Sequence, residues 1–251
     1  MKDVNEAQAL SIRITTHDRF GKYEVNDWIL KNLDLKRGEK ILDIGCGSGK
    51  QLIPYGKIVG KTGVAFGVDI SEELLEGSEE AAKKAKVSIR VKKCGMEELA
   101  EVLGKDRFDA IASSFAIYYS KDIDKTVSDI YSLLKKGGRV FVCGPTEGNN
   151  KELANLHAKV APLPSNFIEN TQFMSNTALP TFKKYFEAVK TSIFRNPITF
   201  PNRKSVLNYW NSYTLFNERA RSKFESLLDE YFNKKSTFVT HKVVLGILAK
   251  K

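Results

Sequence analysis

Apolar residues along the first 145 positions fall into two kinds of segment that alternate. Short, nearly continuous apolar runs bounded by turn residues predict strands at 41–44, 64–70, 87–93, 108–113 and 139–143. Between these runs, apolar residues at spacings of three and four predict amphipathic helices, most clearly at 71–86 and 122–134. Strands that alternate with helices in this way are typical of an α/β protein built on a parallel sheet.

The two ends of the chain extend this pattern. Helical spacing over the first 40 residues predicts an N-terminal helical cap at 1–35. Near the other end, two strands and two helices are predicted at 189–194, 205–216, 218–232 and 238–248. We expect residues 1–251 to form a single domain.

The segment between the fifth and sixth predicted strands is different. Residues 144–180 show no strand pattern and contain one helical piece. Four prolines interrupt them at 145, 162, 164 and 180. An insertion at this place is well positioned to cover a substrate. We therefore expect a lid over 145–185, with Phe167, Ile168, Phe173 and Met174 facing the substrate rather than the core.

The first predicted strand leads into a loop with glycine at every second position. The stretch 41–50 reads ILDIGCGSGK, with Asp43 in the strand and glycine at 45, 47 and 49. Such glycines let the backbone adopt positive φ and let a ligand approach where a Cβ atom would collide. The spacing excludes a P-loop, because Gln51 follows Gly49-Lys50, and it excludes the dinucleotide motif G-x-G-x-x-G, because Lys50 takes the place of its third glycine. The pattern that remains is D-x-G-x-G-x-G.

A second acid stands about 20 residues past the loop, where α/β nucleotide-binding folds place a carboxylate on the ribose hydroxyls. The run VAFGVDI at 64–70 ends in Asp69-Ile70, and a charged helix follows. Ser71 is the better N-cap for that helix. Asp69 is therefore expected to be free for a ligand.

With these two features the chain resembles the Rossmann-like methyltransferases that use S-adenosylmethionine, over roughly residues 36–145. The resemblance implies a doubly wound, mostly parallel seven-stranded sheet with helices on both faces and a last strand inserted antiparallel between the fifth and sixth. It also implies that the glycine loop contacts the methionine and ribose part of S-adenosylmethionine, and that S-adenosylhomocysteine is the product. Tyr23 is a candidate to close over the cofactor, with core packing as the alternative. The positions that the resemblance places at the cofactor are Tyr23, Asp43, Gly45, Cys46, Gly47, Gly49, Asp69, Ile70, Gly95, Met96, Glu97, Ser113 and Ser114.

One of these positions departs from the family's pattern. After the third strand the family usually has Gly-Asp-Ala-Glu-Glu-Leu, whereas this chain has CGMEEL at 94–99. Gly95 thus replaces the acid that would accept the adenine amino group. Met96, through its backbone N–H and side chain, or the Glu97 carboxylate are the candidates to recognise adenine instead.

The resemblance places the acceptor at the end of the fourth strand. Methylases of exocyclic base amines carry a proline-containing motif there, whereas this chain reads SSFAIYY at 113–119, which is similar to the small-molecule branch. Methyl transfer from a sulfonium is a direct displacement that requires alignment and exclusion of water, and a base only where the acceptor must lose a proton. Tyr118, Tyr119 and His157 are the catalytic candidates, with aromatic lining the alternative for the tyrosines and a surface position for His157. No carboxylate cluster indicates a magnesium site, so no metal is expected.

The lengths of the apolar runs and the polar N-terminus indicate where the protein is located. No apolar run approaches the ~20 residues that a membrane span requires, and the polar N-terminus MKDVNEAQAL lacks the apolar core of a signal peptide. A cytoplasmic protein without a membrane partner is therefore expected. Cys46, Cys94 and Cys143 lack metal-ligand spacing and are expected to be buried thiols.

The formal net charge of +10 brings a second class of methyl acceptor, RNA, into consideration. A basic chain suits an RNA partner. However, lysine far outnumbers arginine, and the densest cluster, 83–93, falls on a predicted surface helix and the next strand, where a solvated face explains it. We therefore expect a small-molecule acceptor. An RNA or ribosomal-RNA methyltransferase is the alternative, and a non-catalytic protein that binds S-adenosylmethionine is the third hypothesis.

Overall fold

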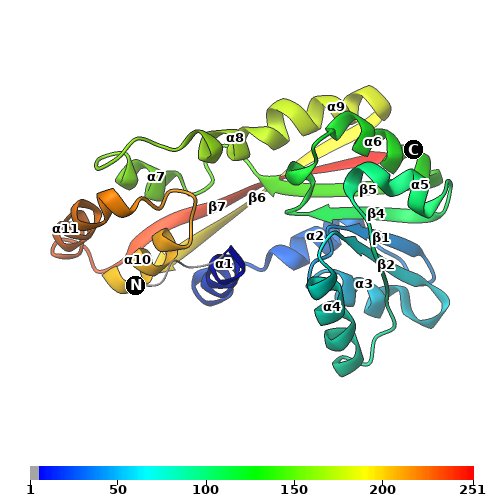
Figure 1. Cartoon of the computed structure of the whole chain (residues 1–251), viewed down its shortest axis with the longest axis horizontal. Coiled ribbons are helices and arrows are strands. Elements are labelled where there is room, and N and C mark those ends of the chain that lie inside the picture. The colour runs from blue at the N-terminus through cyan, green and yellow to red at the C-terminus, as the bar shows by residue number, and fades with distance from the viewer. Residues whose placement is uncertain (1–5) are drawn as a thin grey trace. The chain divides into compact units, whose positions relative to one another are not determined.

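The computed structural model describes residues 6–251, and its central element is a sheet of seven strands with helices around it (Figure 1). The strands are β1 (Lys40–Ile44), β2 (Val64–Asp69), β3 (Arg90–Lys93), β4 (Phe108–Ser114), β5 (Leu134–Pro145), β6 (Ala188–Phe200) and β7 (Phe238–Lys250). Their order across the sheet is β3-β2-β1-β4-β5-β7-β6. The pairs β1–β2, β1–β4, β2–β3 and β4–β5 are all parallel.

The last strand runs antiparallel to β5. Near one end of the pair, Gly137 donates its backbone N–H to the Lys251 carbonyl and Gly138 accepts from the Lys251 N–H, both at 2.9 Å. Towards the other end, Thr146 donates to the Val243 carbonyl at 3.1 Å. Partner numbers that rise on one strand and fall on the other define an antiparallel pair. The predicted fold, a mostly parallel seven-stranded sheet with an antiparallel last strand between the fifth and sixth, is confirmed.

Helices fill most of the remaining chain. The α-helices are α1 (Glu6–Phe20), α2 (Val25–Leu33), α3 (Leu52–Val59), α4 (Glu72–Lys84), α5 (Leu99–Leu103), α6 (Ile123–Leu133), α7 (Lys151–His157), α8 (Ser165–Phe173), α9 (Leu179–Tyr185), α10 (Arg203–Asn211) and α11 (Arg221–Phe232). Single turns of other helix types are η1 (Gly60–Thr62), η2 (Met96–Glu98), η3 (Ile117–Tyr119), η4 (Met174–Ala178) and η5 (Glu218–Ala220). The predicted N-terminal cap corresponds to α1 and α2, except that its first five residues lie outside the described part of the chain.

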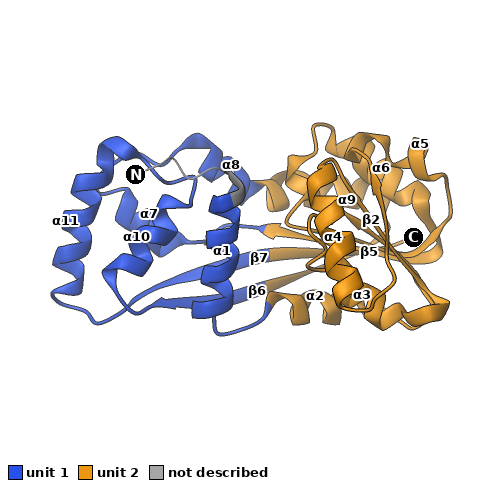
Figure 2. Cartoon of the chain, turned by 60° about the horizontal axis from the view of Figure 1, so that its bottom comes forward, with its two compact units in different colours: residues 1–24, 145–172, 194–244 blue, residues 25–144, 173–193, 245–251 orange. Residues whose placement is uncertain are grey.

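The chain divides into two compact units (Figure 2). Unit 1 comprises residues 1–24, 145–172 and 194–244, and unit 2 comprises 25–144, 173–193 and 245–251. The predicted lid at 145–185 is thus shared between the units. Every candidate cofactor residue except Tyr23 belongs to unit 2.

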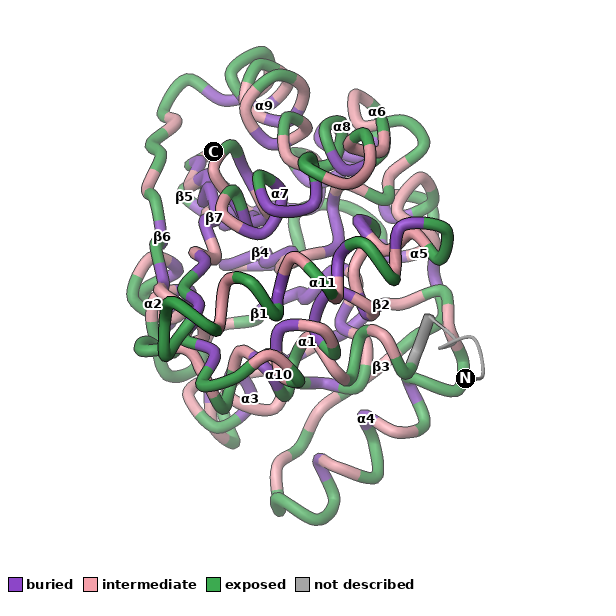
Figure 3. The backbone as a smooth tube through the Cα atoms, turned by 90° about the vertical axis from the view of Figure 1, so that its left-hand side faces the viewer, coloured by how far each residue is buried: buried purple, intermediate pink, exposed green. Residues whose placement is uncertain are grey.

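Unit 2 has helices on both faces of its strands: α5, α6 and α9 cover one face, and α2, α3 and α4 cover the other (Figure 1). Because both faces are covered, central strands are buried along most of their length, as the colouring of β4 shows (Figure 3). Consecutive β1 residues Ile41 and Leu42 are both fully buried for this reason. Each such side chain contributes roughly 1.5–3 kcal/mol by leaving water. The three cysteines are buried and free, as predicted.

Unit 1 has its own core, built on aromatic contacts. The rings of Trp210 and Phe224 stack with centroids 4.2 Å apart, and Phe200 packs against Tyr209 at 5.3 Å. All four side chains are fully buried. The helices α7, α10 and α11 therefore share one apolar centre with β6, to which Leu153 of α7 contributes.

Two of the residues predicted to face a substrate from the lid are instead core residues. Phe167 is buried in unit 1 and Met174 in unit 2. Phe173 packs against the unit 2 core, and only Ile168, at 42%, is well exposed. The prediction was wrong for Phe167 and Met174. The prolines indicated an irregular segment, whereas the chain here forms helices that bury an apolar face. Met174, Ala178 and Phe182 lie four residues apart and are all fully buried. Pro180 lies within this helical run, just after the π-helical turn η4.

Candidate active site

The loop between β1 and α3 folds back over the end of β2. Gly45 and Cys46 both donate their backbone N–H to the Val68 carbonyl, at 2.8 and 3.0 Å. Gly45, Gly47 and Gly49 have φ of 71°, 51° and 82°, which is the left-handed region that favours glycine. The alternate glycines in the sequence therefore correspond to three left-handed backbone positions.

The space around a Cβ atom differs among these three glycines. A Cβ atom at Gly45 would lie 2.4 Å from the Ala116 Cβ, and one at Gly49 would lie 2.5 Å from the Ser78 Oγ, so both glycines permit close packing inside the protein. A Cβ atom at Gly47 would meet nothing within 4 Å. Gly47 is therefore the place where a ligand can approach the loop backbone, and the residues present fit a cofactor held there.

The Asp69 carboxylate holds this loop in place. Its Oδ2 accepts the backbone N–H of Gly47 at 2.9 Å, and its Oδ1 accepts that of Ser71 at 3.0 Å. Ser71 caps α4 as predicted, since its Oγ accepts the Leu74 N–H at 3.3 Å. The expectation that Asp69 is free was wrong. A carboxylate has about four acceptor positions, however, so it retains capacity for ribose hydroxyls.

Asp43 lies beneath the loop in the middle of the sheet, level with Gly67 of β2 and Ala112 of β4. Its side chain is buried, and burial, followed by the nearby Asp69 charge, raises the pKa of Asp43 to about 8. Its Oδ2 accepts no hydrogen bond from any residue that the structure describes. A buried carboxyl oxygen of this kind suits a hydrogen-bond donor supplied by a ligand or by water.

The turn after β3 has Gly95 at the position where the family's pattern has an acid. Gly95 has φ −76°, so the position does not require glycine. Its backbone N–H donates to Glu98 Oε2 at 3.3 Å. A Cβ atom there would lie 3.4 Å from Glu98 Oε2 and 3.9 Å from Glu97 Oε2, so an acid would face two carboxylates. The Met96 methyl lies 3.5 Å from the Cβ position of Gly45, which places this side chain beside the glycine loop.

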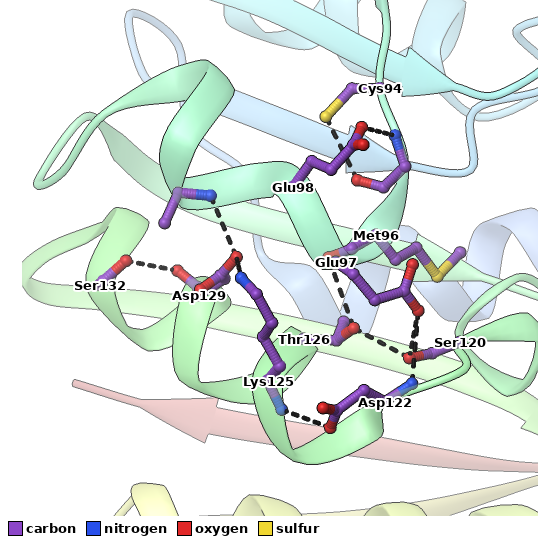
Figure 4. Close-up of polar contacts among 12 residues, drawn as sticks. Cys94, Met96, Glu97, Glu98, Ser120, Asp122, Lys125, Thr126, Asp129 and Ser132 are labelled. Atoms are coloured by element: carbon purple, nitrogen blue, oxygen red, sulfur yellow. Dashed lines mark hydrogen bonds and ion pairs between the residues drawn. The ribbon is translucent and has the colours of Figure 1, made fainter.

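Glu97 has partners that the sequence did not indicate. Its Oε1 accepts hydrogen bonds from Ser120 and Asp122, in the loop between β4 and α6 (Figure 4). The same oxygen accepts the backbone N–H of Lys121, which lies between them. Burial raises the pKa of Glu97, but the hydrogen bonds, that of the Lys121 N–H foremost, outweigh it, and the net pKa is lowered. One of the two Glu97 oxygens is thus already committed within the protein.

The carboxyl end of β4 adjoins the glycine loop. Ser113 is buried and donates its Oγ–H to the Ile44 carbonyl at 3.0 Å. Phe115 has φ 58°, a left-handed conformation that is uncommon for a non-glycine residue and that no sequence signal revealed. The rings of Tyr118 and Tyr119 follow, with centroids 4.7 Å apart. Tyr119 is 68% exposed, whereas Tyr118 packs beside Gly144.

His157 is not at the surface, which is where the sequence suggested it would be. It is fully buried in unit 1, and its Nδ1 accepts the Trp210 Nε1–H at 3.2 Å. Its Nε2 lies 3.3 Å from the Pro162 carbonyl, and burial lowers the pKa of His157. Both ring nitrogens are thus engaged inside the core, and we do not assign His157 a role at the acceptor.

Tyr23 lies in unit 1, just before α2. Its backbone N–H donates to Asn196 Oδ1 at 2.9 Å, and its carbonyl accepts from Asn196 Nδ2 at 2.8 Å. The side chain is exposed. Its closure over a cofactor stays a prediction.

Two further findings concern residues 6–251. No three His, Cys, Asp or Glu side chains in this part of the chain gather closely enough to hold a metal ion. None of its helices combines the length and apolarity needed to cross a membrane.

Comparisons with known proteins agree with this geometry. A family model described as a methyltransferase domain matches residues 35–200. The chain is 25% identical to demethylmenaquinone methyltransferase of Staphylococcus saprophyticus, covering 77% of each chain, and 26% identical to 2-phytyl-1,4-naphtoquinone methyltransferase of Nostoc punctiforme, covering 59% of this chain and 68% of that one. Its fold is similar to phosphoethanolamine N-methyltransferase 2 of Haemonchus contortus, solved with S-adenosyl-L-methionine, with TM-score 0.60, 20% identity and coverage of 98% of this chain and 57% of that one.

The chain belongs to the methyltransferase domain family, because the family model covers well over half of its residues. The predicted class is confirmed: the protein is an S-adenosylmethionine-dependent methyltransferase.

Proposed function

We propose that S-adenosylmethionine binds along the carboxyl ends of β1 to β4, over the loop Gly45–Gly49. The observation that carries this proposal is the open approach to Gly47, whose backbone is held by Asp69. When bound, the cofactor supplies a methyl group on a sulfonium, which a nucleophile displaces directly. We assign the methionine end to the glycine loop and Cys46, and the ribose to Asp69.

For the adenine ring we propose an apolar site between Ile70 and Met96. Ile70 follows Asp69 directly and is 72% exposed, which is unusual for a large apolar side chain at the end of a buried strand. Met96 lies beside the glycine loop in the same unit. Because Glu97 and Glu98 both have partners within the protein, recognition by the backbone around Gly95 and Met96, rather than by a carboxylate, is the simplest arrangement.

For the acceptor we propose a small, largely apolar or aromatic molecule that docks at the end of β4. Support comes from the paired rings of Tyr118 and Tyr119 and from the two relatives named for quinones. The exposed Tyr119 would orient the acceptor, while Tyr118 and Ser114 line the floor. These residues act by alignment and by excluding water, which is what a direct displacement requires.

Calorimetry on the wild-type protein tests the cofactor part of this proposal. S-adenosylhomocysteine should bind, and NADH and ATP should not. Binding of either nucleotide without binding of S-adenosylhomocysteine would refute the assignment of the loop.

A labelled-methyl assay tests the acceptor. The protein would be incubated with methyl-labelled S-adenosylmethionine and, in parallel, with demethylmenaquinone, phosphoethanolamine, bulk RNA and fractionated small-molecule extract. We expect label in an organic-soluble product and none in RNA. Label in RNA that is lost steeply as salt rises would favour the RNA alternative instead.

A further inference from the structure

The loop after β3 and the loop after β4 are joined by side chains rather than by backbone pairing. Glu97 Oε1 accepts the Lys121 N–H at 2.7 Å, the Ser120 Oγ–H at 3.1 Å and the Asp122 N–H at 3.4 Å. One carboxylate oxygen thus holds three consecutive residues of the other loop. Figure 4 shows its bonds to Ser120 and Asp122. Hydrogen bonds to an ionised acceptor are roughly twice as strong as neutral ones, so this is the dominant tie between the two loops.

A second, weaker tie runs alongside it. The buried Thr126 of α6 lies 2.9 Å from Ser120 through their hydroxyls, and its Oγ1 donates to the Met96 carbonyl at 3.4 Å. Asp122 in turn caps α6 by accepting the Lys125 N–H at 3.0 Å. Ser120 therefore has contacts with both loops and with the helix that follows.

The two loops that Glu97 joins carry the two proposed binding sites. Met96 and Gly95, immediately before Glu97, belong to the proposed adenine site, while Tyr118 and Tyr119, immediately before Ser120, belong to the proposed acceptor site. We propose that Glu97 is a positioning residue that couples the two: a cofactor held at Met96 fixes Glu97, and Glu97 fixes the segment that carries Tyr118 and Tyr119. This inference rests on the proposed function, because it takes both sites as assigned there.

The neighbouring carboxylate provides a matched control. Glu98 lies one position further on the same turn and hydrogen-bonds to the Gly95 N–H at 3.3 Å. Like Glu97 it accepts a backbone N–H, but within the described part of the chain its carboxylate makes no hydrogen bond to residues 120–122. Glu98→Ala therefore removes a charge and a cap from the same turn while leaving the link to the β4 loop in place.

Hydrogen exchange with S-adenosylhomocysteine as the probe measures the coupling without a known acceptor. The informative amides are those of Tyr119 and Ser120, which donate to the Ala116 and Ile117 carbonyls and not to Glu97. In the wild type and in Glu98→Ala, S-adenosylhomocysteine should slow exchange at 117–120 by at least about tenfold. In Glu97→Ala the ligand should still protect 95–98 but should no longer protect 117–120.

The conservative variant separates positioning from general stability. Glu97→Gln retains one oxygen acceptor, so protection at 117–120 should return in part. Should Glu97→Ala fail to fold, Ser120→Ala combined with Glu97→Gln weakens the link from both sides, because it removes the Ser120 hydroxyl bond and the charge of the acceptor. Protection at 117–120 should then fall below that of Glu97→Gln alone. Equal protection in Glu97→Ala and the wild type, or equal loss in Glu98→Ala, would overturn the coupling. A wild type that does not bind the ligand would instead refute the proposed function.

Discussion

The backbone N–H of Gly47 donates to the Asp69 carboxylate at 2.9 Å, although 22 residues separate the two in the chain. This bond joins the loop after β1 to the end of β2, the two neighbouring strands that the proposed cofactor would bridge. The same carboxylate accepts the Ser71 N–H on its other oxygen. Asp69 therefore holds the loop in place before any ligand arrives. The binding role that we propose for it adds to this structural role.

Asp69→Asn should impair both roles. The amide presents an NH₂ group to one of the two backbone N–H donors, so one hydrogen bond to a charged acceptor is lost and a half-buried donor is left without it. We expect the free energy of unfolding to fall by about 1–3 kcal/mol. Affinity for S-adenosylhomocysteine should fall as well. Urea denaturation and calorimetry measure the two effects, with the exposed Asp34→Asn as a control that leaves affinity unchanged. Unaltered affinity in Asp69→Asn would remove this residue from the binding site.

The raised pKa of Asp43 predicts a specific dependence of stability on pH. The folded protein keeps this carboxyl protonated up to about pH 8, whereas the ordinary value is 3.8. Between these values the folded state binds one more proton than the unfolded state, so stability falls as pH rises, by up to about 1.4 kcal/mol per pH unit from this group. Asp43→Asn lacks this contribution.

Denaturation of the wild type and of Asp43→Asn at pH 5, 6.5 and 8 checks this directly. The variant should gain stability relative to the wild type at each step upward in pH, since all other titrating groups are shared. Parallel stability curves would show that Asp43 is already ionised in the folded protein.

Restoring an acid at position 95 should not help by itself. The new carboxylate would approach Glu98 and Glu97, which are 3.4 and 3.9 Å from the Cβ position. Gly95→Asp should therefore bind S-adenosylhomocysteine no better than the wild type. Adding Glu98→Gln removes one repelling charge, so the double variant should bind more tightly than Gly95→Asp alone. If Gly95→Asp alone bound S-adenosylhomocysteine more tightly than the wild type, the adenine site would tolerate the extra charge.

Met174 should behave as a core residue. Its side chain is fully buried in the cluster that contains Phe182 and Leu245. Met174→Ala should lower the free energy of unfolding by about 2–5 kcal/mol. Ile168→Ala, at a half-exposed position on the preceding helix, should cost at most about 0.5 kcal/mol. Equal and small effects in both would instead support a loosely packed lid.

Local patterns in the sequence predicted the sheet and the glycine loop, but not the contacts between distant segments. Strand runs, the D-x-G-x-G-x-G spacing and the Ser71 cap are all encoded within a few residues. The partners of Glu97 lie 23 to 25 residues away and the Trp210 donor to His157 lies 53 away, so only the folded chain brings them together. The left-handed Phe115 was missed because its residue type gives no signal for that conformation.

We propose above all that a ligand sits against the backbone at Gly47, and a matched pair of substitutions tests this most directly. Gly47 and Gly137 both have positive φ, 51° and 78°, and an added Cβ would meet no atom within 4 Å at either position. An alanine should therefore cost roughly 1–2 kcal/mol of backbone strain at each. Only Gly47 lies in the proposed site. Calorimetry with S-adenosylhomocysteine should show binding lost or strongly weakened in Gly47→Ala and unchanged in Gly137→Ala. Equal affinity in the two variants would contradict the claim.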